Sequence, residues 1–499
     1  MRSSHNAYPV REGFSSRRCD MPSFSRRTFL QRAAACGAAL SVPMVASSRV
    51  LGANDEITVG VVGLGIRGLG AHVPGFQHQK GVRVLAVADA DRTRAAAAAE
   101  TIKKRYGLAV QHFQDMRKVF DIKEIDVIGN ATMNYWHALS TIWACQAGKH
   151  VYVEKPLSHF IWEGRQMVNA ARKYNRLVQC GTQNRSAGTQ RAAAAWIRAG
   201  NLGKIKFITA FANKPRTSCG KRDKPLEIPE WIDYDLWCGP APKAPVYRDR
   251  LQYDCSFDWR YGDGESCNQG IHEIDMARLV LGDIPDLPRR TISIGGRFVF
   301  NDACDVPNTQ IIYYDFPEAP VLYEVHNLRK AKGSNEVPTF RGIRVGVTVD
   351  CEGGWVDLYS GKVYDTKGKL VTTITGPGED HFENFIRAVR SGDRQVLTAE
   401  VLVGHLSTRI CHVGNISYRV GAPAPVSEAR KRIDGTGEFV AMYERFLEHL
   451  KAHEIDPNTA VLGQWLECDS ENECIKNHPK ANELVRGTYR PPYIVPDLS

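Results

Sequence analysis

The sequence predicts an α/β protein in which an N-terminal doubly wound parallel sheet is followed by an α+β domain with a large, mostly antiparallel sheet. The first observation is that apolar runs alternate with helical patterns from Ile57 to Cys180, as in a parallel sheet covered on both faces. The second is that alternating, β-rich segments replace this pattern further along the chain. With 499 residues, the chain is long enough for two or three domains with ample cores.

The first predicted strand ends in a glycine-rich turn. The stretch Ile57–Gly70 reads ITVGVVGLGIRGLG, in which an apolar run breaks into the pattern GxGxxG and continues as a helix. In a Rossmann dinucleotide-binding unit, the first glycine allows a sharp turn, the second lets the backbone approach a pyrophosphate, and the third lets helix and strand pack closely. The helix N-terminus then binds the phosphates. The cofactor-binding candidates in this turn are Gly63, Gly65, Ile66, Arg67 and Gly68.

The second predicted strand, Val82–Ala88, ends in an acidic residue. Asp89 follows Gly65 by 24 residues, close to the spacing at which a carboxylate accepts hydrogen bonds from the adenosine ribose. Because a carboxylate there repels a 2′-phosphate, we expect NAD to be favoured over NADP. Asp89 could instead cap the helix that begins near Arg92, and Arg92 and Arg94 leave some room for NADP.

The remaining elements complete a Rossmann domain over residues 55–180. They are a helix (Arg92–Tyr106), an extended piece near Val110, a strand (Ile125–Asn130), a helix (Asn134–Ala147), a strand (His150–Val153), a helix (Ile161–Tyr174) and a strand (Leu177–Cys180). Each helix joins two strands of one sheet, so the strands are expected to run parallel.

Residues 181–420 are expected to form the α+β domain for substrate binding and oligomerisation. The β-rich segments are Ile205–Ala212, Arg289–Phe300, Gln310–Phe316, Val321–Asn327, Arg341–Cys351 and Trp355–Tyr359. The helical segments are Gln190–Ala199, Asn268–Leu281, His381–Ser391 and Glu400–Val420, the last of which could pack back on the first domain. Residues 421–499 are expected to form one helix, Gly437–His453, and a tail extended along the surface.

The first 53 residues have the character of an export leader. Ser25–Leu30 (SRRTFL) resembles the twin-arginine signal, and the alanine-rich stretch Ala33–Ala46 is too short for a membrane-spanning helix. We therefore expect export by the twin-arginine route to the periplasm, with no stable membrane insertion. The alternative is an arginine-rich disordered tail. Because this route moves folded proteins, a cofactor can travel inside the protein.

The charge of the chain is concentrated in this leader. Residues 1–53 hold eight arginines and two acidic residues, so they carry +6 of the formal +10. The nearly balanced remainder gives no reason to propose nucleic acid or an anionic membrane as a partner.

The 13 cysteines are irregularly spaced, include no CxxC pair and predict no metal site. Most are expected to be buried apolar side chains. Cys468 and Cys474, in an acidic loop, are the one pair suspected of forming a disulfide.

Chemically reactive side chains follow the strand His150–Val153. Ligands of an open parallel sheet bind beyond the carboxyl ends of its strands. Here the strand runs into Glu154, Lys155 and Pro156, and the proline favours an extended Lys155 at the strand tip. A partly desolvated lysine beside a nicotinamide would have a lowered pKa and could take up a substrate's hydroxyl proton. Glu154 could orient the lysine or contact the cofactor, and the alternative is a surface salt bridge.

A second polar group follows the strand Ile125–Asn130. Thr132, Asn134 and His137 lie on a turn and on the first turn of a helix. They could line the nicotinamide side of the cleft, although capping of that helix is as good an explanation for Thr132 and Asn134.

The densest polar cluster of the sequence lies in the second domain. Asn268, His272 and Asp275 are spaced so that one helix face would carry all three. A histidine on that face, directed at the first domain, is a plausible proton acceptor. Alone, a histidine beside polar groups is more often structural.

Together these motifs resemble the Gfo/Idh/MocA oxidoreductase family from Ile57 to about Gly421. The resemblance rests on VGLGIRG, AVADAD, ATMNYWHA, AGKHVYVEKPL, QCGTQNR, NQGIHEIDMARLVLG, HFENFIRAVRSG and GHLSTRICHVGNISYRVG. It implies that Lys155 of EKP is the catalytic lysine, that His272 is its acid/base partner, and that Gln183 of QCGTQNR contributes to the cofactor site. Asn268 stands where the family often has aspartate, and an amide can orient a hydroxyl but cannot carry its proton. Met133 stands where proline is common in the family.

The resemblance implies an NAD-dependent dehydrogenase, exported, acting on a secondary alcohol of a sugar, cyclitol or glycoside. Lys155 and His272 would handle the hydroxyl proton. An alternative is a glycosidase or lyase that retains NAD and acts by transient oxidation and elimination. A third possibility is a catalytically idle binding protein. By family analogy, the exposed face of the large sheet predicts a homodimer or homotetramer.

Overall fold

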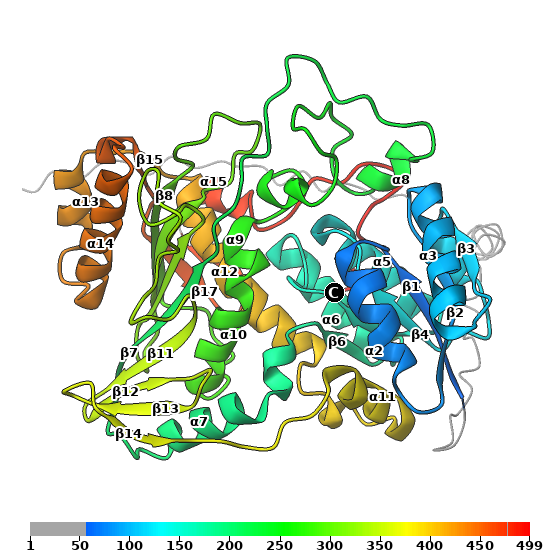
Figure 1. Ribbon diagram of the computed structural model, residues 1–499, viewed down its shortest axis with the longest axis horizontal. Coiled ribbons are helices and arrows are strands. Elements are labelled where there is room, and N and C mark those ends of the chain that lie inside the picture. The colour runs from blue at the N-terminus through cyan, green and yellow to red at the C-terminus, as the bar shows by residue number, and fades with distance from the viewer. Residues whose placement is uncertain (1–55, 477) are drawn as a thin grey trace, which may run out of the picture. The chain divides into compact units, whose positions relative to one another are not determined.

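The computed structural model describes residues 56–476 and 478–499, so the predicted leader lies outside the described residues. Within the described part, the chain forms one compact unit with two sheets (Figure 1). No helix of this part is both long and apolar enough to span a bilayer.

The N-terminal sheet is parallel throughout and has the strand order β3-β2-β1-β4-β5-β6. Its strands are β1 (Ile57–Val62), β2 (Val82–Ala88), β3 (Gln111–Phe113), β4 (Val127–Asn130), β5 (His150–Val153) and β6 (Val178–Cys180). The strand order reverses between β1 and β4, where ligands bind in open α/β sheets. Most residues of the central strands are buried because both sheet faces are covered.

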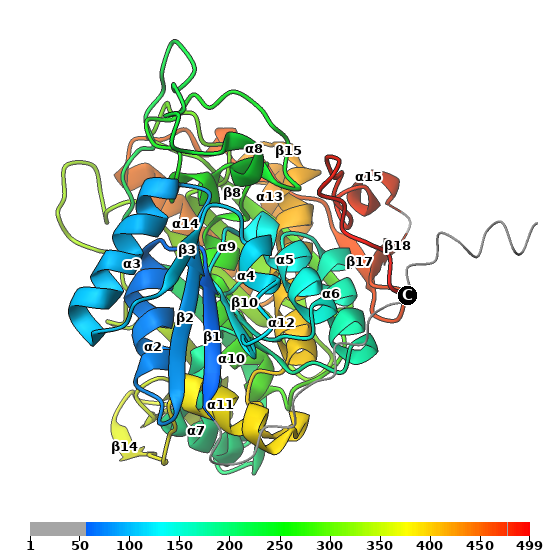
Figure 2. The ribbon, with the colours of Figure 1, turned by 90° about the vertical axis from the view of Figure 1, so that its right-hand side faces the viewer.

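Helices cover the two faces of this sheet, as Figure 2 shows. They are a short π-helical turn (Gly68–His72), α2 (Val73–Gln77), α3 (Arg92–Tyr106), α4 (Arg117–Phe120), α5 (Asn134–Gln146) and α6 (Ile161–Lys173). Helix α3 packs on one face with α11 (His381–Ser391), and α5 and α6 pack on the other. Helix α11 comes from a later part of the chain, so the first sheet is completed by long-range contacts.

The second sheet has 12 strands and the main order β14-β13-β12-β11-β7-β10-β9-β8-β16-β15. Its strands are β7 (Ile205–Asn213), β8 (Arg290–Gly296), β9 (Thr309–Asp315), β10 (Val321–His326), β11 (Val345–Cys351), β12 (Gly354–Asp357), β13 (Lys362–Asp365), β14 (Leu370–Thr373), β15 (Ala422–Pro423), β16 (Val461–Leu462), β17 (Leu466–Asp469) and β18 (Cys474–Lys476). Strands β7 and β10 pair in parallel, and the other pairs are antiparallel. The predicted mostly antiparallel sheet is therefore confirmed.

Helices pack on both faces of the second sheet. They are α7 (Gly188–Arg198), α9 (Gly264–Asn268), α10 (Gly270–Val280), α12 (Val401–Arg419), α13 (Val426–Ile433) and α14 (Glu438–Ala452), with the short helices α8 (Tyr234–Cys238) and α15 (Pro479–Asn482) in connecting segments. Helix α12 contacts β8, α10 and also α6, as expected of a helix that packs back on the first domain. Helices α13 and α14 cover the other face at β8, β9 and β10 (Figure 1).

The C-terminal tail has no regular secondary structure after α15 (Pro479–Asn482), and most of its residues are exposed or half-buried, as expected of a tail along the surface. Tyr493 and Val495 are the exceptions, because they are buried in the core beside α5 and α6. Arg490 donates to Asp235 at 2.7 Å, and the Leu498 amide donates to the Gln166 side chain at 2.7 Å. The tail therefore stabilises the first sheet, which its proline-rich sequence did not indicate.

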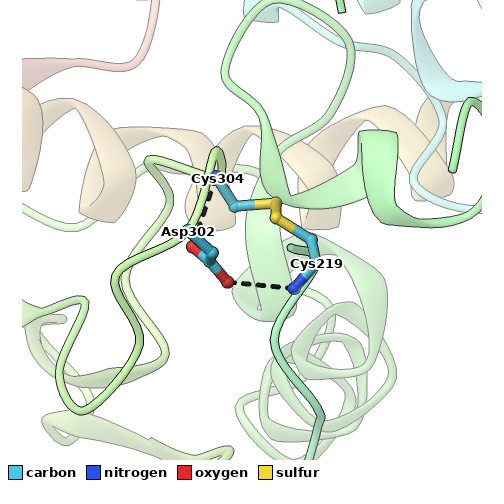
Figure 3. Close-up of side chains that lie close together, drawn as sticks. All are labelled: Cys219, Asp302 and Cys304. Atoms are coloured by element: carbon cyan, nitrogen blue, oxygen red, sulfur yellow. Dashed lines mark hydrogen bonds between the residues drawn. A yellow bond between two sulfur atoms is a disulfide. The ribbon is translucent and has the colours of Figure 1, made fainter. Parts of the chain in front are cut away.

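The disulfide pairing differs from the expected one. Cys468 and Cys474 are both free, whereas Cys219 and Cys304 are bonded across 85 residues of sequence. Asp302 accepts from the Cys219 amide at 3.0 Å and from the Cys304 amide at 3.3 Å (Figure 3). Two loops thus meet at a place that sequence spacing does not reveal. Most of the free cysteines are buried, as expected.

Candidate active site

The three glycines of the turn have different surroundings. Gly63 has φ +79°, a left-handed conformation that favours glycine. Gly68 packs so closely on Gly63 that an added Cβ would overlap the Gly63 carbonyl. Gly65 has no neighbouring atom within 4 Å of the place a Cβ would occupy, so the space beside it is open for a ligand. The turn therefore fits the pyrophosphate of a dinucleotide.

Asp89 is held at the end of β2. Its side chain is 9% exposed and accepts from the amides of Leu64 at 2.8 Å and Asp91 at 3.0 Å. Burial raises the pKa of this carboxyl, while Arg94 and these amides oppose the shift. Asp91, and not Asp89, caps α3 by accepting from the amides of Thr93 and Arg94. The capping explanation for Asp89 is therefore wrong.

A cavity of about 710 Å³ extends from the glycine turn to the α9–α10 junction. This volume is within the usual range for small-molecule and cofactor sites. Every cofactor-binding and catalytic candidate from the sequence lines it except Gly68, which packs behind the turn. Gln183, which begins a short helix after β6, is among the lining residues.

Glu154 connects β5 to the glycine turn. Its Oε1 accepts from Arg67 Nη2 at 2.6 Å and lies 3.2 Å from His72 Nε2. Burial acts to raise the pKa of Glu154, but His72, Arg67 and Lys155 outweigh burial and hold that pKa well below its usual range. Glu154 is therefore a charged group that ties the cofactor turn to the strand tip.

Lys155 projects from the tip of β5 to the second domain. Its Nζ donates to the backbone oxygen of Asn268 at 2.5 Å and to Asn268 Oδ1 at 3.2 Å. Burial lowers the pKa of Lys155, which the charges of Glu154 and Glu265 partly oppose. The alternative of a surface salt bridge is wrong, because Lys155 forms no ion pair with any described residue and lines the cavity.

His272 lines the same cavity from α10. It is buried, and its Nδ1 has no hydrogen-bond partner among the described residues. Burial and the charge of Lys155 lower its pKa to about 3, so the imidazole is neutral near pH 7. One ring nitrogen of a neutral imidazole can accept a hydrogen bond from a ligand hydroxyl, and the other can donate one.

The predicted continuous helix through Asn268 is interrupted. Asn268 ends α9, and α10 begins at Gly270 with Gln269 between them. This junction exposes the Asn268 backbone oxygen to Lys155. Asp275 does not share the cavity face; it accepts from Arg185 at 2.8 Å and from Ser407 at 2.6 Å. The expectation that one helix face presents all three residues is therefore wrong for Asp275.

The residues after β4 line the cavity without capping α5. Met133 occupies the N-cap position and makes no side-chain cap. Thr132 donates from Oγ1 to Asn130 Oδ1 at 2.7 Å. His137 lies between two backbone carbonyls, 2.7 Å from that of Pro156 and 3.1 Å from that of Thr132. His137 therefore joins the loop after β4 to the loop after β5, and it is a structural residue of the cavity wall.

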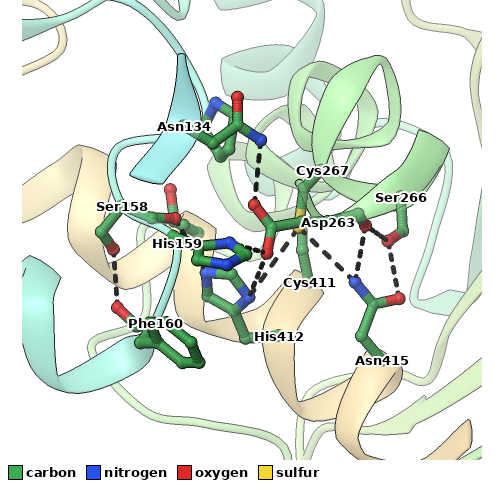
Figure 4. A network of polar contacts seen from close by, with 12 residues as sticks. Asn134, Ser158, His159, Phe160, Asp263, Ser266, Cys267, Cys411, His412 and Asn415 are labelled. Carbon is green, nitrogen blue, oxygen red and sulfur yellow. Dashed lines mark hydrogen bonds and ion pairs between the residues drawn. The ribbon is translucent and has the colours of Figure 1, made fainter. Parts of the chain in front are cut away.

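Asn134 is oriented by a buried polar network (Figure 4). Its Nδ2 donates at 2.9 Å to Asp263, whose other carboxylate oxygen lies 2.8 Å from His159 Nδ1. Burial acts to lower the pKa of His159, but the Asp263 carboxylate outweighs burial and the pKa of His159 is raised. Burial likewise acts to raise the pKa of Asp263, but His159 outweighs burial and the pKa of Asp263 is lowered. A carboxylate accepts only, so the amide nitrogen of Asn134 is held on Asp263 and its oxygen is left for a ligand.

Sequence reasoning missed the cavity wall that follows β7. This wall includes Lys214, Arg216 and Tyr253, with Gln269 from the α9–α10 junction. The basic residues of KPR, directly after a predicted strand of the second domain, were the available signal. Nothing local indicates that this segment faces the first domain, because that placement depends on how the two sheets pack.

Comparisons with known proteins agree with this architecture. Residues 57–182 match the family model described as oxidoreductase family, NAD-binding Rossmann fold, and residues 201–324 match its C-terminal alpha/beta domain. The WlbA dehydrogenase from Bordetella pertussis, solved in complex with NADH and UDP-GlcNAcA, has the same fold, with a TM-score of 0.52 and 19% identity. That likeness covers 71% of this chain and 94% of the other.

Two curated relatives match shorter stretches. Glycosyl hydrolase family 109 protein 2 of Shewanella sp. (strain ANA-3) is 30% identical over 173 residues, which is 30% of this chain and 38% of that protein. Levoglucosan dehydrogenase of Pseudarthrobacter phenanthrenivorans is 25% identical over 223 residues, covering 42% of this chain and 47% of that protein. The matches thus span less than half the length of each relative.

The open space at Gly65, the carboxylate of Asp89 and the cavity between them fit NAD. With two matched domains that together span half of its length, the chain belongs to the Gfo/Idh/MocA oxidoreductase family and has an NAD-binding Rossmann domain.

Proposed function

We propose that the protein is an NAD-dependent oxidoreductase acting on a secondary alcohol of a sugar, cyclitol or glycoside. The observation that carries this proposal is that Lys155, at the tip of β5, and His272, on helix α10, line one cavity with the glycine turn. When bound, NAD supplies the capacity to exchange a hydride with the substrate carbon. The chain's own residues then have to position the alcohol and move its hydroxyl proton.

Lys155 is the proposed proton acceptor. In alcohol oxidation, its neutral amine takes the hydroxyl proton as the carbonyl forms, and in reduction the ammonium returns it. The lowered pKa of Lys155 makes the neutral amine more accessible near neutral pH. Asn268 holds the ammonium through its backbone and side-chain oxygens, so the proton is delivered from a defined place. His272, neutral near pH 7, hydrogen-bonds the same hydroxyl.

The test is turnover by purified protein that carries its nucleotide, with a panel of sugars, cyclitols and glycosides and absorbance of reduced nicotinamide as the readout. Lys155→Met is expected to lower kcat about 10²- to 10⁴-fold, the usual contribution of general acid–base catalysis, while NAD still binds. Lys224→Met removes an exposed lysine outside the cavity and serves as the matched control. Unchanged turnover in Lys155→Met would refute the role of Lys155.

A second function is supported by the similarity to glycosyl hydrolase family 109 proteins. We propose as the alternative a glycosidase that retains NAD and acts by transient oxidation and elimination. The discriminating measurement is stoichiometry on aryl glycosides. A dehydrogenase accumulates NADH or consumes a second substrate, whereas the retaining cycle releases the aryl alcohol with no net change in NADH.

We also propose that the protein is exported to the periplasm by the twin-arginine route. The leader motif supports this, and so does the Cys219–Cys304 disulfide, because disulfides persist mainly in oxidising compartments. Cell fractionation of the wild type and of a variant with Arg26→Lys and Arg27→Lys tests the route. Equal amounts of both in the periplasm would refute it.

The oligomeric state is a further proposal, made by family analogy. A homodimer or homotetramer would pair through the open face of the second sheet. Helices α13 and α14 already cover that face at β8, β9 and β10, so the remaining candidate surface is at β11, β12 and β13. Sedimentation equilibrium measures the state, and a monomer at micromolar concentration would refute this proposal.

A further inference from the structure

The arginines that line the cavity are all neutralised by carboxylates. Each has a carboxylate oxygen within 4 Å of its guanidinium, and the four pairs come from different parts of the wall. The pairs are Arg67–Glu154 at 2.6 Å, Arg94–Asp89 at 3.7 Å, Arg117–Asp115 at 2.7 Å and Arg216–Glu265 at 2.8 Å. These residues therefore contribute little net charge to a ligand.

The two lysines that line the cavity differ from the arginines. Neither Lys155 nor Lys214 has a carboxylate within 4 Å among residues 56–476 and 478–499. Lys155 donates to Asn268, and Lys214 donates to Gln269 Oε1 at 2.8 Å. Because Asn268 and Gln269 are neighbours at the α9–α10 junction, two unneutralised ammonium groups converge on one part of the cavity. The charge of Lys214 also acts to lower the pKa of Lys155.

The acidic residues nearest this junction do not neutralise Lys214. The Glu265 side chain is fully buried and pairs with Arg216 through both oxygens. Glu273 accepts from Gln269 Nε2 at 2.9 Å and from Tyr359 Oη at 3.0 Å. Burial raises the pKa of Glu273 to about 8, so this carboxyl is mostly protonated near pH 7. Gln269 is thereby fixed, with its oxygen on Lys214.

Two nearby cations, neither of them in direct contact with a carboxylate of the described residues, repel each other in a partly desolvated cavity. Such an arrangement is unfavourable until a negative group is bound, because charges removed from water require a partner. Lys155 is required for proton transfer under the function proposed above, but that role does not require a second lysine. Lys214 follows β7 in the second domain and is not part of the glycine turn that receives the nucleotide phosphates.

We propose that the substrate is an anionic sugar, and that Lys214 binds its carboxylate, phosphate or sulfate group while Lys155 faces the reacting hydroxyl. This inference rests on the proposed function, since it names the substrate class of the same cavity. Lys214 acts as a point charge with three donors, one of which is held by Gln269. The other two remain for the anion of the ligand.

The test compares matched pairs of ligands on protein carrying NAD. D-Glucuronate and D-galacturonate are the carboxylate probes, glucose 6-phosphate is the phosphate probe, and D-glucose and D-galactose are the neutral controls. Calorimetry measures binding, and absorbance of reduced nicotinamide measures turnover. Lys214→Gln removes the charge and retains a polar side chain, while Lys221→Gln removes a lysine of the same segment that lies outside the cavity.

We expect the wild type to bind at least one anionic probe about 10- to 100-fold more tightly than its neutral counterpart, the range of a hydrogen bond to a charged group. Lys214→Gln should abolish this preference and Lys221→Gln should keep it. Equal binding of anionic and neutral sugars by the wild type, no binding of any anionic probe, or an unchanged preference in Lys214→Gln would overturn the inference. Turnover confined to neutral sugars would also overturn the inference of an anionic substrate, but it would leave the proposed function in place. A preference for anions in binding without any redox turnover would support the inference and refute the proposed function.

Discussion

Two single substitutions in the glycine turn test its role in cofactor binding separately from its role in packing. In Gly68→Ala, the added Cβ would lie 2.9 Å from the Gly63 carbonyl carbon and still closer to its oxygen, whereas ordinary contact begins at 3.4 Å. The carbonyl oxygen is the nearer atom, so the backbone of the turn must shift by about 1 Å or more, because no flexible side chain can give way. Overpacking of this kind costs about 1–3 kcal/mol, and a rigid backbone places this case at about 3 kcal/mol.

Gly65→Ala meets no protein atom within 4 Å, and Gly65 does not require a positive φ. Its free energy of unfolding without nucleotide should therefore stay within about 0.5 kcal/mol of the wild type or rise by about 0.4–1 kcal/mol. The same methyl group fills the space that a pyrophosphate enters, so NAD affinity should fall about 10- to 100-fold.

Urea unfolding of the nucleotide-free proteins and calorimetric titration with NAD measure these two quantities. The reasoning fails if Gly65→Ala binds NAD as tightly as the wild type, or if Gly68→Ala is as stable as the wild type. A variant such as Gly107→Ala provides a control for a strained glycine outside the cavity, because its φ is +69° and it should lose stability without losing NAD affinity.

The remaining predictions concern charge. Asp89→Asn keeps the shape of the side chain that accepts from the amides of Leu64 and Asp91, but it removes the negative charge that repels a 2′-phosphate. The ratio of NAD affinity to NADP affinity should therefore fall about tenfold. An unchanged ratio in fluorescence titrations would contradict this prediction. Asp263→Asn should lower the free energy of unfolding by about 3 kcal/mol, because it leaves buried His159 without its carboxylate. The pKa of His159 is raised, so the stabilising effect of His159 is present below pH 6.5 and is lost as pH rises through its folded-state pKa. The pKa of Asp263 is lowered, so the stabilising effect of Asp263 is lost as pH falls below 3.8. The difference between wild type and variant should therefore be largest near pH 5–6, and a constant difference from pH 5 to 9 would argue against the ion pair.

Features that depend on local sequence were predictable. The β-branched run ending in GxGxxG predicts the strand, the turn and the open space at Gly65, because each follows from neighbouring residues. Asp89 and Lys155 were identifiable because they directly follow strands of a parallel sheet, whose carboxyl ends share one edge.

Features that depend on distant contacts were not predictable from spacing. Asp275 has the helical spacing of a site residue, but Arg185 and Ser407 draw it away from the cavity. The Cys219–Cys304 bond joins loops that only the second sheet brings together. Helix α13 was missed as well, since it packs on the sheet beside α14 although its own sequence is strongly charged.

The sequence by itself determined the two-sheet architecture, the dinucleotide turn and the lysine at the tip of β5, because periodicity and turn chemistry are local properties of a chain. Only the tertiary structure decided which residues of the second domain face that lysine. The break between α9 and α10, the wall with Lys214 and the orientation of Asn134 arise where the two sheets pack together, and side chains far apart in sequence acquire neighbours there that no local pattern specifies.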